Sequence, residues 1–370
     1  MIYKDFQGEK LSMLGYGLMR LPILDGDSDK IDEKEAERLI DYAYAHGINY
    51  FDTAWGYHGG NSELITGKAL SKYPRESFKL TTKFPGYDLL NFPKMEEIFD
   101  KQLEKLQVEY FDFYLFHNLC ELNLKQYLDP VYHIHDSIME RKRDGRIKHV
   151  GLSNHGSPEC LREFLDAYGD DIEFCQLQLN FMDWNFQKAK ECVEILRERH
   201  IPIWVMEPLR GGNLLDMASA EECFRWLQSI DDVTVVLSGM TTFEQLEENI
   251  RIFEEDKPLS KEDFDALVEK ADSKIRDGSV PCTACRYCID HCPRELDIPY
   301  LISMYNEYKL TKNDFVAPMA IAALEKGKKP WSCIGCQSCE AVCPQKLPIA
   351  EIFRNFTKAL KKVGDEGIKD

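Results

Sequence analysis

The sequence lacks the features that would place it in a membrane or on nucleic acid. No stretch approaches the roughly 20 apolar residues that a membrane-spanning helix needs, and the first ten residues carry charges where a secretory signal needs an apolar run. Asp and Glu outnumber Lys and Arg by 64 to 46, and the resulting formal net charge of −18 opposes binding to phosphate backbones. We therefore expect a cytoplasmic protein that binds neither a membrane nor a nucleic acid.

Short stretches rich in β-branched and aromatic residues alternate with longer amphipathic stretches between Leu11 and Phe253. Two of the amphipathic stretches have clear ends: one is closed by Gly47, and the other is opened by Ser157 and closed by Gly169. This alternation predicts parallel strands joined by crossover helices. The eight strand-like stretches are LGYGLMRLP, NYFDTA, FKLTTKF, YFDFYLFHN, IKHVGLSNH, EFCQLQLN, IPIWVMEP and VTVVLSGM.

Eight such units in about 250 residues predict an α/β fold, a closed (β/α)8 TIM barrel. The alternative is an open doubly wound sheet, which usually carries G-x-G-x-x-G after its first strand. Here Gly15 and Gly17 have no third glycine after them. The alternation stops near residues 272–279, so we expect a barrel over residues 1–272 and a second domain over residues 273–370.

Four polar side chains follow successive predicted strands of the barrel. Asp52 and Tyr57 follow the second strand, Lys83 ends the third and His117 ends the fourth. Active sites of barrels lie at the C-terminal ends of the strands, so these groups are expected to meet at one rim. An ammonium near a phenol lowers the phenol's pKa, and a phenol tuned in this way can protonate a carbonyl oxygen.

These residues resemble the aldo/keto reductase family over about residues 1–255. The resemblance implies an enzyme, an NAD(P)-dependent oxidoreductase acting on a small carbonyl or alcohol. Tyr57 would be the general acid, Lys83 and Asp52 would tune it, and His117 would orient the carbonyl. It also implies that Ser153 and Asn154 of GLSNH, with the help of Gln176, hold the nicotinamide carboxamide.

The family resemblance implies further nicotinamide contacts after the last two strands. Gly211 and Gly212 follow strand seven, and Thr242 and Gln245 are spaced as a capping box at a helix start, where barrels commonly bind phosphate. The remaining contacts implied are Met206, Pro208, Leu209, Ser238, Gly239, Glu248 and Asn249.

Two positions depart from the family pattern. Met206 stands where the family usually stacks a Tyr under the nicotinamide, and Gly239 and Gln245 stand where many members place the cations that bind the 2′-phosphate of NADP. The family favours NADP, whereas the missing cations keep NAD as an alternative.

Eight of the 13 cysteines form two copies of one motif, C-x2-C-x2-C-x3-C-P. In this bacterial run the fourth cysteine ligates the other cluster. The sequence therefore predicts two [4Fe-4S] clusters, with zinc as the less suitable alternative because zinc needs neither the third cysteine nor the final C-P. The predicted ligands are Cys282, Cys285, Cys288 and Cys343 for one cluster, and Cys333, Cys336, Cys339 and Cys292 for the other.

Both runs resemble two-cluster ferredoxins, but about forty residues separate them. The intervening LDIPYLISMYNEYKL and FVAPMAIAALEKG predict helices, so we expect a mainly α-helical ferredoxin-like domain. Hydride moves as an electron pair, whereas clusters pass single electrons. The domain could relay electrons to a redox partner protein, sense redox state or stabilise the fold. The alternative function is an electron-transfer protein whose barrel only binds nicotinamide.

Overall fold

The computed structural model describes residues 1–282, 285–311 and 316–364. The chain divides into two compact units, Met1–Val268 and Glu269–Asp370, and each is described here by itself. The division falls inside helix α11 (Lys261–Gly278), as does the boundary predicted after residue 272.

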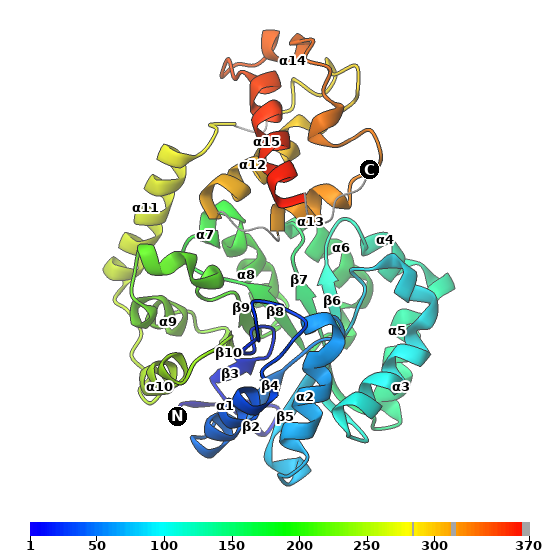
Figure 1. Ribbon diagram of the computed structural model, residues 1–370, viewed down its shortest axis with the longest axis vertical. Coiled ribbons are helices and arrows are strands. Elements are labelled where there is room, and N and C mark those ends of the chain that lie inside the picture. Colours follow the sequence, from blue (N-terminus) through cyan, green and yellow to red (C-terminus); the bar gives the residue numbers. More distant parts are fainter. Residues whose placement is uncertain (283–284, 312–315, 365–370) are drawn as a thin grey trace. The chain divides into compact units, whose positions relative to one another are not determined.

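The first unit is a closed barrel of eight parallel strands, in the order β10-β3-β4-β5-β6-β7-β8-β9 (Figure 1). This confirms the predicted (β/α)8 fold. Each of the eight predicted strands is present, and almost every residue in them is buried, as expected for a sheet covered by helices. The strands are β3 (Leu14–Gly17), β4 (Tyr50–Asp52), β5 (Lys79–Phe84), β6 (Phe111–Leu119), β7 (Ile147–Asn154), β8 (Phe174–Gln178), β9 (Ile203–Met206) and β10 (Val233–Ser238).

Helices surround these strands (Figure 1), and their ends follow the local sequence signals. Ser157 caps α6 by accepting a hydrogen bond from the Cys160 amide, and Gly47, with φ of 91°, follows the end of α1. The helices of this unit are α1 (Glu33–Ala45), α2 (Asn61–Leu70), α3 (Met95–Leu106), α4 (Leu124–Leu128), α5 (Ile134–Arg143), α6 (Pro158–Tyr168), α7 (Asp183–Phe186), α8 (Ala189–Glu198), α9 (Ala220–Gln228) and α10 (Phe243–Ile252).

An N-terminal hairpin that the sequence analysis did not predict precedes the barrel. Strands β1 (Tyr3–Phe6) and β2 (Glu9–Ser12) pair antiparallel around Gln7 and Gly8, which both have positive φ. Phe6 packs edge-on against Trp204, with ring centroids 5.0 Å apart, and shares a buried cluster with Phe113 and Phe174. The hairpin therefore fills part of the barrel core.

A buried carboxylate ties helix α2 to strand β5 and helix α3. Glu63 is fully buried and accepts hydrogen bonds from the Thr82 hydroxyl at 2.7 Å, the Gln102 amide at 2.8 Å and the Lys105 ammonium at 3.1 Å. The same Gln102 amide donates to the carbonyl of Lys83 at 3.0 Å. The network therefore fixes the strand that carries Lys83.

The second unit is mainly helical, as predicted. Its helices are α12 (Ile298–Thr311), α13 (Val316–Ala322), α14 (Ser338–Ala341) and α15 (Ile349–Gly364). Its core joins apolar side chains such as Ile302, Phe353 and Phe356 to two cysteines, Cys288 and Cys339. The predicted helical stretch that starts at residue 315 begins outside the described residues.

The internal repeat of this unit extends beyond the cysteine motif. Its two copies are offset by a constant 51 residues, from Cys282 to Cys333 and from Leu296 to Leu347. Positive φ recurs at this offset, at Arg286 and Gln337 and again at Glu295 and Lys346. Each copy then leads into a long helix, α12 or α15. The two copies therefore share left-handed backbone residues at two equivalent positions.

No helix among residues 1–282, 285–311 and 316–364 is long and apolar enough to cross a membrane.

We expect Glu63→Ala to lower the free energy of unfolding by about 3–5 kcal/mol, because removing one partner leaves the Lys105 ammonium and two buried donors without their acceptor. Urea unfolding measures this loss. Glu97→Ala, which removes an exposed carboxylate paired with Lys101, is the matched control and should leave the unfolding midpoint nearly unchanged. If both variants lowered the free energy of unfolding by the same amount, the stabilising role of the Glu63 network would be contradicted.

Candidate active site and iron–sulfur ligand sets

The ends of three neighbouring strands bring the predicted polar residues together. Asp52 ends β4, Lys83 lies near the end of β5 and His117 lies in β6. Tyr57 begins a short 3-10 helix, Tyr57–Gly60, directly after β4. The strands are hydrogen-bonded neighbours in the barrel, so their C-terminal ends open on one rim.

Lys83 and Asp52 form a buried ion pair. The Lys83 ammonium lies 2.6 Å from the Asp52 carboxylate and 2.7 Å from the carbonyl oxygen of Thr53. Lys83 is fully buried and Asp52 is 3% exposed. The second carboxylate oxygen of Asp52 accepts a hydrogen bond from Gln176 at 3.3 Å. Each charge is therefore held by more than one partner.

Burial sets the electrostatics of this pair. It lowers the pKa of Lys83, and the Asp52 carboxylate opposes that shift by stabilising the ammonium. It also raises the pKa of Asp52, against the opposite pull of the Lys83 charge and hydrogen bonds. Each charge is therefore disfavoured by burial and favoured by the partner beside it.

Tyr57 lies against this pair, but its pKa is not lowered as the sequence suggested. The Lys83 ammonium lies over the Tyr57 ring, 5.1 Å from its centroid, while it donates to Asp52 and Thr53. Burial raises the pKa of Tyr57 well above 10, the carboxylates of Asp52 and Glu207 add to the rise, and Arg20 opposes it. The phenol is therefore held protonated and is not brought toward neutrality.

His117 is a buried, neutral imidazole. It is 8% exposed, and its Nδ1 atom has no hydrogen-bond partner within the described part of the chain. Burial lowers the pKa of His117 well below 6.5, and the nearby Lys83 charge lowers it further. A neutral ring of this kind can donate one hydrogen bond to a carbonyl oxygen without carrying a charge.

The predicted carboxamide-binding residues lie on the next two strands. Ser153 of β7 is paired in register with Gln176 of β8, and Asn154 follows Ser153 at the end of its strand. All three are at least 97% buried. Gln176 also reaches Asp52, which links this group to the ion pair. The arrangement suits a primary amide, because these side chains offer both donors and acceptors.

The loop after β9 has the open backbone expected of a phosphate cradle. Gly211 and Gly212 have φ of 66° and 94°, and a Cβ atom at Gly212 would meet no atom within 4 Å. The predicted contacts Met206, Pro208 and Leu209 lead into this loop. Glycine is required here because side chains rarely adopt this conformation.

Arg20, which the sequence analysis did not single out, lies beside this cradle. A Cβ atom at Gly211 would be 3.1 Å from its guanidinium, and one at Gly239 would be 3.0 Å from its Cβ. Its side chain is 44% exposed and pairs with Glu207 at 3.3 Å. In the sequence, only its position shortly after the first barrel strand could have indicated that Arg20 lies at the rim of the site.

The helix after β10 begins at the predicted cap, but the reciprocal bond of the predicted capping box is replaced by one to the preceding residue. Thr242 caps α10 by accepting a hydrogen bond from the Gln245 amide, and the Gln245 side chain accepts from the Thr241 amide. Asn249 is buried and donates to the Ser238 hydroxyl at 2.9 Å, whereas Glu248 is exposed. Neither Gly239 nor Gln245 supplies a cation here.

A buried ion pair, also missed from the sequence, holds the glycine loop. Arg210 donates to both carboxylate oxygens of Asp183 at 3.1 Å, and both residues are buried. Asp183 also accepts from Asn180, which donates to the carbonyl of Glu207. The loops after β8 and β9 are therefore tied together.

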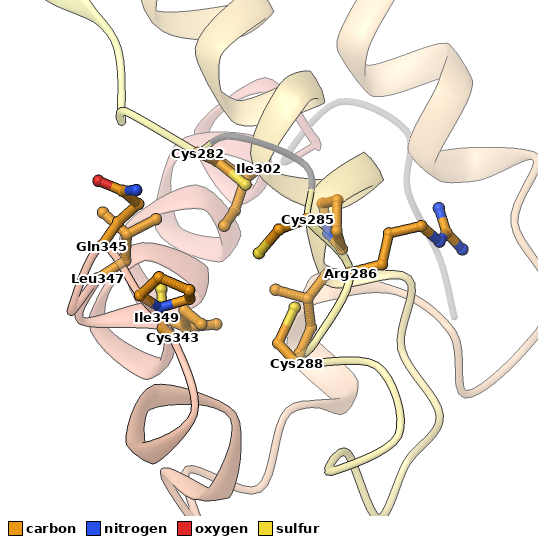
Figure 2. A pocket seen from close by; sticks show the side chains of 12 residues that line it. Cys282, Cys285, Arg286, Cys288, Ile302, Cys343, Gln345, Leu347 and Ile349 are labelled. Atoms are coloured by element: carbon orange, nitrogen blue, oxygen red, sulfur yellow. The ribbon is translucent and has the colours of Figure 1, made fainter.

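The eight clustered cysteines line two hollows of nearly equal size, about 330 and 340 Å³. Cys282, Cys285, Cys288 and Cys343 line the first, and Figure 2 shows their sulfur atoms around it. The second is lined by Cys292, Cys333, Cys336 and Cys339. Each hollow thus receives three cysteines of one motif and the last cysteine of the other.

Cysteines at equivalent positions of the two motifs have the same degree of exposure in the two hollows. Cys285 and Cys336 are exposed, whereas Cys288 and Cys339 are each 8% exposed and belong to the core of the unit. Across the described residues, no three His, Cys, Asp or Glu side chains are arranged to hold a single metal ion. The thiols suit a larger inorganic group, because a cubane is bound by one cysteine at each iron.

A (β/α)8 barrel with these residues on its rim, followed by a helical unit with two cysteine-lined hollows, defines an oxidoreductase with an iron–sulfur domain. The profile of the aldo/keto reductase family matches residues 13–222, and that of the 4Fe-4S dicluster domain matches residues 281–347. The chain belongs to the aldo/keto reductase family. Membership implies use of a nicotinamide cofactor, and the second domain implies iron–sulfur clusters.

Relatives support this assignment. A probable aldo-keto reductase 1 from Glycine max is 31% identical over 56% of this chain and 58% of its own length. An NADH-specific methylglyoxal reductase from Escherichia coli is 26% identical over 70% of this chain and 96% of its own length. The holo form of the aldo-keto reductase AKR11C1 from Bacillus halodurans shares the fold, with a TM-score of 0.61 and 23% identity over 73% of this chain and 96% of its own.

We expect His117 to remain neutral from about pH 8 to about pH 6, because burial and the Lys83 charge both disfavour the imidazolium. Nitrogen-15 NMR of the imidazole measures this directly. In Lys83→Met the pKa of His117 should rise, since one of the effects that disfavour the imidazolium is removed. Titration of the wild-type imidazole near its ordinary pKa would contradict the buried, neutral state.

Proposed function

We propose that the barrel reduces a small carbonyl compound, or oxidises the corresponding alcohol, by hydride transfer with NAD(P)H. The observation that carries the proposal is the meeting of Tyr57, His117 and the buried Lys83–Asp52 pair at one rim of the barrel. A bound reduced nicotinamide supplies the hydride to the carbonyl carbon. Ser153, Asn154 and Gln176 would hold its carboxamide, and the loops after β9 and β10 would hold its phosphates.

In this proposal the side chains handle the carbonyl oxygen. The neutral His117 ring donates a hydrogen bond that positions this oxygen, and the Tyr57 hydroxyl gives it a proton as hydride reaches the carbon. The raised pKa of Tyr57 keeps its proton available until that moment. The phenolate formed in this step must regain a proton before the next turnover.

Two observations bear on the choice of nicotinamide. The family pattern favours NADP, but Gly239 and Gln245 provide no cation for a 2′-phosphate, and the similar Escherichia coli protein is described as NADH-specific. Arg20, beside Gly211 and Gly239, is a cation that could contact a phosphate of either cofactor. We therefore infer that NADH is accepted as well as NADPH.

We further infer that residues 273–370 hold two [4Fe-4S] clusters, one in each hollow. The cysteine spacing supports this, and so does the contribution of Cys343 and Cys292 to the hollow of the other motif. The exposed Cys285 and Cys336 favour a relay of single electrons to a partner protein over a purely structural role, because electron exchange needs a cluster edge near the surface.

Anaerobic mixing with NADH or NADPH, with and without a panel of aldehydes and ketones, tests the proposed reaction. We expect carbonyl-dependent oxidation of the nicotinamide, and Tyr57→Phe should slow it by about 10²- to 10⁴-fold while nicotinamide binding is kept. The visible absorption of the clusters is followed at the same time. Bleaching of the clusters by the reduced nicotinamide without a carbonyl compound would favour the electron-relay role. If Tyr57→Phe turned over the carbonyl compounds at the wild-type rate, Tyr57 would be excluded as the general acid.

Iron analysis tests the exchange of cysteines between motifs. The reconstituted protein should hold about eight irons, and Cys343→Ala about four. The double variant Cys282→Ala/Cys343→Ala should still hold about four irons, because both cysteines serve one cluster. If Cys343 instead served the cluster of its own motif, the double variant would lose both clusters. Cys223→Ala, in barrel helix α9, is the control and should lose no iron.

A further inference from the structure

Tyr87 is an aromatic residue of the active-site rim that has no part in the proposed proton transfer. It lies on the loop after β5, and its ring meets the His117 ring edge-on, with centroids 5.3 Å apart and planes at 86°. Tyr57 meets the same imidazole edge-on at 6.1 Å and 79°. Two phenols thus contact the imidazole that would orient the carbonyl.

The Tyr87 hydroxyl lies directly over Gly56, the residue before Tyr57. A Cβ atom added at Gly56 would lie 2.2 Å from the hydroxyl oxygen and 3.2 Å from the adjacent ring carbon. No real Cβ atom tolerates such a contact, so the phenol takes this place only because residue 56 is glycine. The ring is 40% exposed, and two later residues of the loop, Leu89 and Leu90, are 45% and 74% exposed.

This hydroxyl has no hydrogen-bond partner among the residues that the structure describes. The phenols of Tyr16, Tyr114 and Tyr127, which are buried in the barrel, each donate to an oxygen at 2.7 to 2.8 Å. Burial raises the pKa of Tyr87 to about 12, and the neighbouring Tyr57 adds to the rise. The group is therefore a protonated, unused donor at the mouth of the site.

We propose that Tyr87 determines substrate specificity by donating a hydrogen bond to a second oxygen of the substrate, next to the reacting carbonyl. The substrates would then be 2-oxo or 2-hydroxy carbonyl compounds. This inference rests on the proposed carbonyl reduction at Tyr57 and His117. Because His117 contacts both phenols, a carbonyl oxygen held by the imidazole would place its neighbouring carbon close to Tyr87.

A packing role alone does not account for the hydroxyl. A phenylalanine would give the same edge-on contact with His117, and without the hydroxyl the closest approach to a Cβ atom at position 56 would be 3.2 Å instead of 2.2 Å. A site that hydrogen-bonds a substrate oxygen discriminates against an analogue without it, and here the discrimination is moderate because the partly exposed Tyr87 hydroxyl can bond to water instead. The geometry therefore favours recognition of a polar substituent over an apolar or aromatic one.

Steady-state kinetics of the full chain, with its clusters reconstituted, test the proposal. The probes are methylglyoxal and propanal, which have the same carbon skeleton but differ in the second oxygen. For Tyr87→Phe we expect kcat/KM to fall about tenfold with methylglyoxal, mostly through KM, and to change by no more than about twofold with propanal. Nicotinamide affinity, followed by cofactor fluorescence, should be unchanged.

Two further variants separate the hydroxyl from the loop. Leu90→Ala alters the same loop at an exposed position and should leave both substrates unaffected. Gly56→Ala should displace the Tyr87 hydroxyl and reduce kcat/KM for methylglyoxal more than for propanal. The double variant Gly56→Ala/Tyr87→Phe should have the same ratio of kcat/KM values for the two substrates as Gly56→Ala alone, because the displaced hydroxyl no longer contributes.

Three outcomes would overturn the proposal. Equal losses with both substrates in Tyr87→Phe would make Tyr87 a packing residue, and no loss with either would make its hydroxyl irrelevant. If the wild-type protein reduced neither of these substrates nor any other carbonyl compound of the panel, the proposed function would be overturned and this inference with it. The first two results leave the proposed function intact, so the two failures are distinguishable.

Discussion

A lysine ammonium with no access to solvent is the constraint on which the barrel site depends. Removing such a charge from water costs several kcal/mol unless a counter-charge and further acceptors replace the water. Asp52 and the carbonyl of Thr53 do so at 2.6 and 2.7 Å, and Gln176 holds the other oxygen of Asp52. Since these partners sit on different strands, the ion pair also fixes the spacing of the strand ends.

The same constraint explains why the neighbours of Lys83 are themselves held. Gln102 donates to the Lys83 carbonyl and to the buried Glu63, so the backbone that presents the ammonium cannot shift independently of α2 and α3. Burial, together with this fixed positive charge, then keeps the His117 imidazole neutral.

The sequence predicted the barrel, its eight strands and the convergence of Asp52, Tyr57, Lys83 and His117, because strand alternation and strand ends depend on local patterns. It did not predict the β1–β2 hairpin, which the Gln7-Gly8 turn signals only weakly. The roles of Arg20 and Tyr87 depend on loops that meet across the rim, and no spacing within one segment encodes such a meeting.

Burial opposes the expected tuning of Tyr57 for a similar reason. Proximity along the rim suggested that Lys83 would lower the phenol's pKa, but the ammonium directs its hydrogen bonds to Asp52 and Thr53 and faces the ring. The direction of a side chain depends on its other partners, which only the assembled barrel supplies. Burial then dominates and raises the pKa of Tyr57.

In the second unit the repeat and the exchange of cysteines have a shared electrostatic consequence. Arg286 and Gln337 are equivalent in the repeat, as are Arg294 and Gln345. Because the last part of each motif reaches the other hollow, Arg286 and Gln345 line the first and Gln337 and Arg294 line the second. Among the described residues, each hollow is therefore lined by one arginine and by no carboxylate, in a chain with a net charge of −18. The crossing of the two halves therefore gives both hollows the same polar pair, although the Arg286 guanidinium itself points away from the first hollow (Figure 2) and pairs with Asp297 at 3.2 Å.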